Sequence, residues 1–379
     1  MTTFVGIGCM SGSSLDGLDI CCVEFTGDRH TDLWSYRLLA AETIPYTNVW
    51  TDRLSKAATL MGADLIKLHV DYGHFVGEMV SEFIQKKNLR SVQFVASHGH
   101  SVFHQPSEGF TFQLGDGETT STHLNVPYVC DFRSKDISLG GEGAPLVPCG
   151  ERFLYTSEHL CVNLGGISNI GIKGHYGYDI SPCNILLNRL AKKADDSKSF
   201  DKDGEMARSG EVIPDLMQQL NNWSYYKEKP PKSLWRNQID SDVFSLLEND
   251  KANVQDLLRT CTEHIASKIA EACVQAKGLL SSVSVPRILI TGGGALNKFL
   301  MELITKKLDD AEFEVEKADE DTINFKEALI FAFLGLRCML GEENVFHDIT
   351  GSKRDTISGS IHRPMPGANS KTASLLGDR

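Results

Sequence analysis

Hydrophobic and polar residues follow one another along the chain in patterns that predict strands and helices. Phe4 to Met10 and Leu18 to Phe25 are short apolar segments joined by a glycine-containing turn, which predicts two paired strands. Between Asp64 and Asn88 apolar residues recur at three- and four-residue steps, the spacing of a one-sided amphipathic helix. The N-terminal part is therefore expected to begin as a hairpin and to continue through a long helix.

Three short strand candidates follow, at residues 92–99, 110–116 and 126–133, and each ends in polar or small residues. Strand ends are where mixed α/β folds usually place their chemistry. Residues 138–148 have the composition of a linker. After them, residues 161–174 repeat the opening pattern of strand, glycine turn and strand, which indicates an internal duplication.

The second half adds two predicted helices, at residues 212–220 and 253–277, and one segment of particular interest. Residues 287–308 read as an apolar strand, three glycines and an amphipathic helix. A strand that leads through a glycine turn to a helix N-terminus is suited to binding part of a nucleotide.

Composition limits the class of protein. The chain has 379 residues, 41% hydrophobic and 23% charged, which predicts a folded protein of two domains or one duplicated domain. The net charge of -12, without a cluster of Lys and Arg, argues against nucleic-acid binding. Its longest apolar stretch, residues 328–336, is too short to span a membrane, and the N-terminus lacks signal-peptide features. The ten cysteines lack C-x-x-C spacing, so we expect buried thiols in a cytoplasmic protein.

The first glycine turn has the composition of a phosphate-binding loop. Glycines let backbone N–H groups approach a phosphate closely, and serine hydroxyls add donors. Its carboxylates cannot contact phosphate, but Asp16 and Asp19 can hold Mg²⁺ or its waters. The residues that we assign to the nucleotide here are Gly12, Ser13, Ser14, Leu15, Asp16, Gly17, Leu18 and Asp19. From this segment alone, a solvated hairpin loop is the alternative.

Two further glycine turns weaken that alternative. Two glycine hairpins and one strand-to-helix glycine turn are expected when two similar domains clamp one nucleotide. Walker A and Rossmann motifs are absent from the sequence. We therefore expect an α/β protein of two similar actin-like (ribonuclease-H-like) domains, with mixed sheets flanked by helices and a nucleotide cleft between them. The nucleotide residues assigned in the second half are Gly165, Gly166, Gly292, Gly293, Gly294 and Asn297.

Candidate chemistry centres on Asp179, at a predicted strand end just beyond the second hairpin. A carboxylate there would face the cleft and could act as general base on a hydroxyl or water in line with the γ-phosphate. A local Asx-type cap is the alternative. His98, His100 and His104 lie close together, the first two on one predicted strand face, so metal binding is a further alternative.

Three more residues are candidates for contacting substrate. Arg133 could pair with a polar or anionic substrate group, or form a salt bridge within its own loop. Glu327 stands at the start of an apolar segment that is predicted to be a helix. It could have a role at the cleft, or it could be a favourable acid in the first turn of that helix. Asn184 follows the Asp179 segment and is assigned to the substrate with His98.

The sequence resembles the anhydro-N-acetylmuramic acid kinases, a family within the acetate/sugar kinase, heat-shock-70 and actin superfamily. The resemblance extends nearly from end to end and includes the glycine turns and the Asp179 segment. The segments that carry it are MSGSSLDGLD (10–19), SHGHSVFHQP (97–106), DFRSKDISLGGEGAPLVP (131–148), VNLGGISNI (162–170), YDISPCN (178–184), FDKDGEMA (200–207), TGGGALN (291–297) and FKEALIFAFLG (325–335).

The resemblance implies a bacterial enzyme of cell-wall (peptidoglycan) recycling. Such enzymes use ATP and water to open 1,6-anhydro-N-acetylmuramic acid and phosphorylate the released O6. By the same matching, Asp179 is the base, Arg133 and Glu327 contact the sugar, and residues 292–294 lie near the nucleoside. A homodimer is also implied. We expect domain I at residues 1–133 plus about 345–379, and domain II at 134–344.

The chain departs from the family pattern at several positions. The family's HGQT is HGHS here, so that His100 and Ser101 replace Gln and Thr beside the sugar pocket. The usual D-T-G-P-G-N is D-I-S-P-C-N, and Glu142 and Asn188 are further changes. Two alternatives remain: a kinase of another anhydro sugar, as in the related levoglucosan kinases, or a non-catalytic actin-like ATP-binding module.

Overall fold

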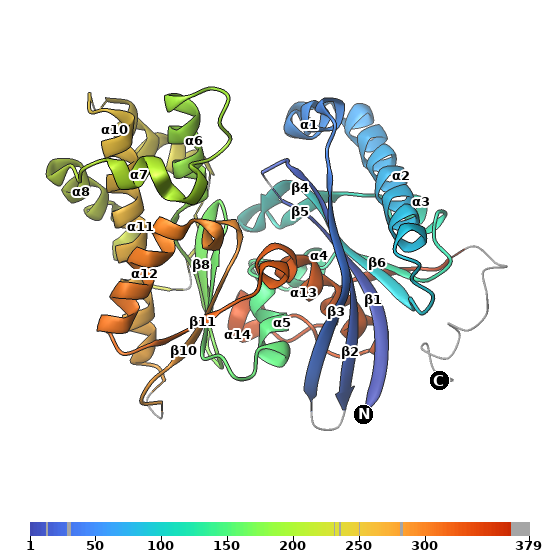
Figure 1. Ribbon diagram of the computed structural model, residues 1–379. Coiled ribbons are helices and arrows are strands. Elements are labelled where there is room, and N and C mark those ends of the chain that lie inside the picture. Colours follow the sequence, from blue (N-terminus) through green and yellow to red (C-terminus); the bar gives the residue numbers. More distant parts are fainter. Residues whose placement is uncertain are drawn as a thin grey trace. The chain divides into compact units, whose positions relative to one another are not determined.

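The computed structural model describes residues 1–12, 14–28, 32–230, 232–234, 236–249, 251–280 and 283–364. The chain forms two compact units. Unit 1 consists of Met1–Tyr155 together with the chain from Phe325 on, and unit 2 consists of Thr156–Asn324. Each unit contains its own sheet with helices packed on it (Figure 1).

Unit 1 contains seven strands in its described part, in the order β12-β6-β4-β1-β2-β3, with β5 paired to β4. The first three strands form an antiparallel meander, whereas β4 and β6 run parallel to β1. Their bounds are β1 (Thr2–Ser11), β2 (Gly17–Asp28), β3 (Leu33–Pro45), β4 (Phe94–Gln105), β5 (Phe110–Leu114), β6 (Tyr128–Cys130) and β12 (Ser360–His362). The hairpin predicted at the N-terminus is therefore confirmed.

Two long helices pack against this sheet on opposite faces. The α2 helix (Gly62–Lys86) buries an apolar stripe against Ile7 and Cys9 of β1, as the three- and four-residue spacing predicts. The other face receives α13 (Glu320–Leu340), where a Cβ on Gly8 would lie only 1.8 Å from the carbonyl oxygen of Ala328. Glycine at position 8 thus permits a close helix-to-sheet approach.

The remaining helices of unit 1 are short. They are α1 (Asn48–Ser55), α3 (Gly117–Ser121), α4 (Ser134–Ser138), α5 (Val147–Leu154) and α14 (His347–Thr350).

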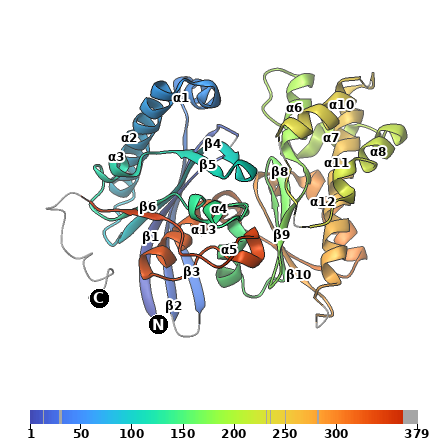
Figure 2. The ribbon, with the colours of Figure 1, turned by 180° about the vertical axis from the view of Figure 1, so that it is seen from behind.

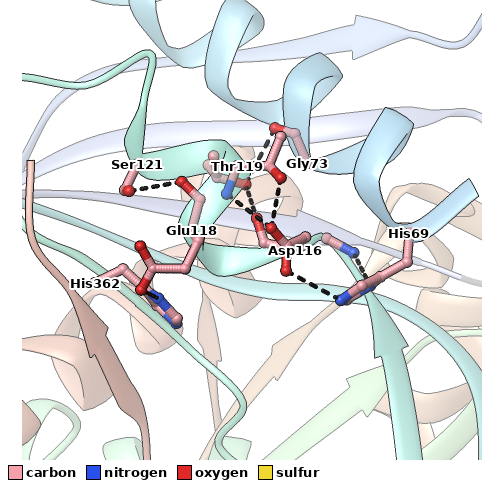
Figure 3. A network of polar contacts seen from close by, with 9 residues as sticks. His69, Gly73, Asp116, Glu118, Thr119, Ser121 and His362 are labelled. Atoms are coloured by element: carbon pink, nitrogen blue, oxygen red, sulfur yellow. Dashed lines mark hydrogen bonds and ion pairs between the residues drawn. The ribbon is translucent and has the colours of Figure 1, made fainter. Parts of the chain in front are cut away.

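A polar network surrounds α3 (Figure 3). The Asp116 carboxylate caps the helix by accepting the Thr119 N–H at 2.8 Å, and it lies 3.7 Å from His69 of α2. On the same helix, Glu118 pairs with His362 of β12 at 2.9 Å. The network ties the last described strand of unit 1 to α3.

Unit 2 contains five strands in its described part, in the order β11-β10-β7-β8-β9. Their bounds are β7 (Leu160–Leu164), β8 (Ile167–Ile172), β9 (Gly177–Pro182), β10 (Arg287–Thr291) and β11 (Glu314–Lys317). The helices, several of them visible in Figure 2, are α6 (Asn184–Ala194), α7 (Glu205–Ser209), α8 (Pro214–Asn221), α9 (Arg236–Gln238), α10 (Ser245–Asn249), α11 (Val254–Lys277) and α12 (Lys298–Asp310). Apolar residues of α11 form much of the core of this unit.

The two sheets share one topology. In unit 2, β7, β8 and β9 form an antiparallel meander, and β10 and β11 add in parallel beside β7. The same directions and order relate β1, β2, β3, β4 and β6 in unit 1. The predicted α/β class with two similar units and mixed sheets is confirmed, and so is the duplication inferred from the glycine turns.

The limits of the units differ from the domain limits expected from sequence. Residues 134–155 and 325–344 belong to unit 1, because α5 and α13 pack together: a Cβ on Gly150 would lie 2.6 Å from Ile330. The linker-like segment 138–148 is held in unit 1 by Asp136, whose carboxylate accepts the Gly143 N–H at 2.8 Å and the Thr350 hydroxyl at 2.7 Å. Residues 365–379 of the expected domain I lie outside the described residues.

Within the described part of the chain, no helix has the length and apolarity needed to cross a membrane.

Candidate functional site

The first predicted phosphate loop joins β1 to β2 in unit 1. Asp16 organises this loop, because its carboxylate accepts the Ser14 hydroxyl at 2.7 Å and the Gly17 N–H at 3.1 Å. Leu15 has a positive φ of 59°, which marks a tight turn. Leu18 is buried in the apolar core, so its side chain packs rather than faces the loop surface. Ser13 lies outside the described residues.

Asp19 lies on β2, just after this loop. Its carboxylate accepts the Thr43 hydroxyl at 2.6 Å. Burial raises the pKa of Asp19 to about 6. The hydrogen bond from Thr43 lowers this pKa, and the negative charges of Asp16 and Glu327 raise it. A cation bound here would relieve the repulsion among these carboxylates.

Unit 1 also brings together three residues that the sequence assigned to the sugar. The Arg133 guanidinium donates from Nε to His98 Nε2 at 3.0 Å and from Nη1 to the Gly143 carbonyl at 2.6 Å. Burial lowers the pKa of Arg133 to about 10, and the Glu327 carboxylate opposes this shift. Burial, followed by the Arg133 charge, lowers the pKa of His98. A neutral histidine and a carboxylate thus lie beside one partly buried cation.

The structure corrects the first-turn interpretation of Glu327. The helix α13 begins at Glu320, so Glu327 lies inside it and not in its first turn. The positive N-terminal end of a helix therefore does not explain a glutamate at this position. The charge of Glu327 does raise the pKa of both Arg133 and Asp19, which connects Glu327 with the predicted site.

The expectation that His98 and His100 share a strand face is wrong. The His98 ring packs on Phe331 of α13, with ring centroids 4.8 Å apart, whereas His100 packs near Tyr72 of α2 on the other face. Gly99 between them has φ of +75°, which breaks the alternation of the strand. Among the described residues, no group of three or more His, Cys, Asp or Glu could hold a metal ion. The three histidines are therefore not a metal centre.

The second predicted phosphate hairpin joins β7 to β8 in unit 2. The N–H groups of Cys183 and Asn184 donate to the carbonyls of Gly166 and Gly165, at 2.8 and 3.1 Å. The Asn184 amide donates to the Leu164 carbonyl at 2.8 Å. Asn184, assigned to the substrate from sequence, thus fixes the hairpin to the start of α6.

The glycine turn after β10 packs directly against this hairpin. Gly292 has φ of +82°, and a Cβ there would lie 2.3 Å from Asn163 Oδ1. A Cβ on Gly294 would lie 2.7 Å from Leu164. Gly293 opens a short 3-10 turn, so α12 begins only at Lys298, where Asn297 caps it by accepting the Leu300 N–H at 3.1 Å. The two glycine turns of unit 2 therefore form one compact group.

Asp179 lies inside β9 and is held from three directions. Its N–H donates to the Lys232 carbonyl at 3.1 Å, its carbonyl accepts the Tyr225 hydroxyl, and Oδ2 accepts the Leu234 N–H at 2.9 Å. These partners are distant in sequence, so Asp179 is not a local Asx cap. Oδ1 has no hydrogen-bond partner among the described residues, and it is not one of their fully enclosed polar atoms.

Burial controls the protonation of this carboxyl. It raises the pKa of Asp179 to about 6, and the hydrogen bond from Leu234 limits the rise. A carboxylate with this pKa is mostly ionised at pH 7 and can still accept a proton, which suits a general base. Sequence reasoning missed all three partners. Lys232 and Leu234 act through backbone groups, which carry no residue-type signal, and Tyr225 acts through its hydroxyl but lies 46 residues from Asp179 in the chain.

Comparison with known proteins identifies the family. The family model described as anhydro-N-acetylmuramic acid kinase matches residues 4–364. A protein of that name from Francisella tularensis subsp. novicida is 33% identical over 94% of this chain and 98% of its own length. Another from Aliivibrio fischeri is also 33% identical, with the same coverage. Among solved structures, an ADPNP-bound activator of 2-hydroxyisocaproyl-CoA dehydratase from Clostridium difficile is 13% identical over 87% of this chain and 94% of its own, with a TM-score of 0.39. From the sequence matches, the chain belongs to the anhydro-N-acetylmuramic acid kinase family.

Proposed function

We propose that this kinase transfers the γ-phosphoryl group of ATP to O6 of 1,6-anhydro-N-acetylmuramic acid while water opens the anhydro bridge. The family match over residues 4–364 supports this substrate and does not favour another anhydro sugar such as levoglucosan. The products are N-acetylmuramic acid 6-phosphate and ADP, which places the enzyme in peptidoglycan recycling.

In the proposed mechanism Asp179 is the general base. It removes a proton from water, and the water oxygen forms a bond to C1 of the sugar. The bond from C1 to O6 breaks, and O6 takes the γ-phosphoryl group as ADP leaves. Positioning and electrostatics supply most of the acceleration, because phosphoryl transfer needs little covalent chemistry from the protein.

The observation that carries this proposal is the setting of the Asp179 carboxylate. Oδ2 is occupied by the Leu234 N–H, so Oδ1 is the oxygen available to a water molecule. The pKa of about 6 keeps the carboxyl ionised at neutral pH while leaving it basic enough to accept the proton. A non-catalytic ATP-binding module would leave this arrangement without a role.

The other site residues divide by unit. In unit 1, Arg133, with His98 and Glu327 beside it, binds polar groups of the sugar, and the β1–β2 loop binds ATP phosphates. In unit 2, the hairpin at Gly165 and Gly166 and the turn at residues 292–294 bind the rest of the nucleotide.

Mg²⁺ fits the acidic pair of unit 1. Mg²⁺ usually takes one or two protein carboxylates and completes its shell with water and substrate phosphates. Asp16, with Asp19 nearby, would hold it, and bound Mg²⁺ would neutralise charge on the phosphates. Burial is the largest cause of the raised pKa of Asp19, and the nearby charges of Asp16 and Glu327 add to it, so a bound cation would favour the ionised form.

We also propose that the enzyme works in the cytoplasm as a homodimer. No disulfide joins any of the ten cysteines, all of which lie in the described part of the chain, and this suits a reducing compartment. Sedimentation at several protein concentrations tests the dimer.

The substrate assignment is tested by ADP release with 1,6-anhydro-N-acetylmuramic acid, levoglucosan and N-acetylmuramic acid. We expect turnover with the first sugar and little with the other two. Preference for levoglucosan would refute the substrate. Slow ATP hydrolysis that no sugar changes would instead favour a non-catalytic module.

A further inference from the structure

Four buried side chains of unit 1 form a continuous hydrogen-bonded chain next to the first phosphate loop. The Tyr72 and Tyr46 hydroxyls lie 2.7 Å apart, Tyr46 donates to the Ser11 hydroxyl at 2.7 Å, and Ser11 lies 2.9 Å from His100 Nδ1. The exposed fractions of Tyr72, Tyr46, Ser11 and His100 are 0, 9, 3 and 6%. The chain therefore runs from the core beneath α2 to the imidazole of His100.

The hydrogens of this chain can be assigned in one direction. Tyr46 has a single hydroxyl hydrogen and gives it to Ser11, so Tyr72 must donate to Tyr46. Ser11 then has its own hydrogen left for its remaining partner, Nδ1 of His100. Burial raises the pKa of both tyrosines, so both phenols stay protonated as donors at neutral pH. The network thus assigns His100 the tautomer that carries its proton on Nε2.

The other ring nitrogen of His100 is not used within the protein. Nε2 has no hydrogen-bond partner among the described residues, and it is not one of their fully enclosed polar atoms. Burial lowers the pKa of His100 to about 4, so the ring is neutral at pH 7. The His100 side chain is more than nine-tenths buried, and its Nε2–H is a neutral donor. This donor is therefore available to a hydrogen-bond acceptor from outside the chain.

The place of His100 in the sheet indicates which partner. Ser11 is the last residue of β1, and it pairs in register with His100 of β4, which runs parallel to β1. Ligands of mixed α/β folds bind beyond the carboxyl ends of such strands. The next residue after Ser11 is Gly12, the start of the proposed phosphate loop. The family pattern places position 100 beside the sugar pocket, but the sugar candidates His98 and Arg133 lie toward the face covered by α13, whereas His100 packs against Tyr72 of α2 on the other face.

We infer that His100 donates a hydrogen bond from Nε2 to a phosphoryl oxygen of the bound nucleotide. This inference rests on the proposed use of ATP. It makes His100 a phosphate-binding residue and Ser11, Tyr46 and Tyr72 the residues that set its tautomer.

The inference is tested by NMR of the wild-type protein with ¹⁵N-labelled histidine, using the signal lost in His100→Phe as the assignment. We expect protonation at Nε2 in the free enzyme. A non-hydrolysable ATP analogue should shift this nitrogen and its proton, and the anhydro sugar alone should not. Protonation at Nδ1, or a shift with sugar and none with nucleotide, would overturn the inference.

Calorimetry separates this test from the proposed function. If the analogue binds but leaves the His100 signal unchanged, the His100 contact is wrong and ATP use stands. If the analogue does not bind, the proposed function fails as well.

Kinetics add a second measurement with a matched pair of variants. His100→Phe removes the donor, so we expect the KM for ATP to rise about tenfold to a hundredfold, with the KM for the sugar within about twofold. His100→Gln keeps an amide donor and should recover most of the ATP affinity. Equal losses in both variants, or a loss confined to the sugar KM, would contradict a phosphate contact.

Discussion

Replacing Asp179 with Asn should make the protein more stable and nearly inactive. The carboxyl is partly buried, and burial raises its pKa from 3.8 to about 6. A shift of about two units at 1.36 kcal/mol each means that ionised Asp179 costs the folded state up to about 3 kcal/mol. Asn has nearly the same shape, and its carbonyl oxygen can still accept the Leu234 N–H. It removes the buried charge without leaving a cavity.

The sign of the pH dependence follows from the direction of the shift. Below about pH 4 the carboxyl is protonated in the folded and the unfolded protein, so wild type and variant should unfold with similar free energies. Between about pH 4 and pH 6 the unfolded chain loses this proton more readily than the folded chain, and the wild type loses relative stability. Above about pH 6 the difference should level off at its full value.

Urea unfolding of both proteins from pH 4 to pH 8 measures this difference. The sugar-dependent ADP assay should show a turnover loss of about 10²- to 10⁴-fold in the variant, as expected for a missing general base. The stability of the variant minus that of the wild type should be larger at pH 7 than at pH 4. An equal difference at both pH values would show that burial of the ionised Asp179 carboxylate does not destabilise the fold. Turnover within tenfold of wild type would remove Asp179 from the mechanism.

Asp201→Asn provides a matched control in the same unit. Both oxygens of Asp201 accept backbone N–H groups, from Met206 at 3.0 Å and from Ala207 at 2.9 Å. An amide offers only one acceptor oxygen, so one buried N–H would lose its partner at a cost of about 1–3 kcal/mol. This variant should be less stable than wild type at pH 7, the opposite of Asp179→Asn.

Three further substitutions test separate parts of the structure. Gly292→Ala adds a Cβ at a positive φ of 82° and should weaken ATP binding at least tenfold, measured by calorimetry, with the sugar KM little changed. Gly8→Ala places a Cβ 1.8 Å from the Ala328 carbonyl oxygen and should lower unfolding free energy by more than about 2 kcal/mol in urea titrations. Arg133→Lys cannot reproduce both hydrogen bonds of the guanidinium group, to His98 and to the Gly143 carbonyl. The sugar KM should therefore rise at least tenfold while nucleotide affinity is kept. An unchanged sugar KM would exclude Arg133 from substrate binding.

Local patterns in the sequence predicted the repeated parts of the fold well. The β1–β2 and β7–β8 hairpins are alternating or apolar segments around glycine turns, and α2 shows its buried stripe at regular spacing. The start of α13 was misplaced for a physical reason. Much of this helix is buried on all sides, so it lacks the one-sided pattern that marks where a surface helix begins.

The candidate site was predictable only in part. Asp179, Arg133 and Glu327 could be named because charged side chains near apolar strands and turns stand out. The hydrogen bond from Leu234 to Asp179 could not, since every residue except proline has the same backbone N–H. The opposite faces of His98 and His100 also depend on one backbone angle, that of Gly99, which no pattern of polar and apolar residues records.

The chain order of the two units has a consequence for synthesis on the ribosome. Unit 2 occupies one uninterrupted stretch, Thr156–Asn324, and all of its described strands have been translated by Lys317. Unit 1 needs α13 and β12, which follow those strands in the chain. Synthesis of unit 1 therefore starts before that of unit 2 but is completed after it. While unit 2 folds, the sheet of unit 1 still lacks α13, so one of its faces is uncovered in the nascent chain.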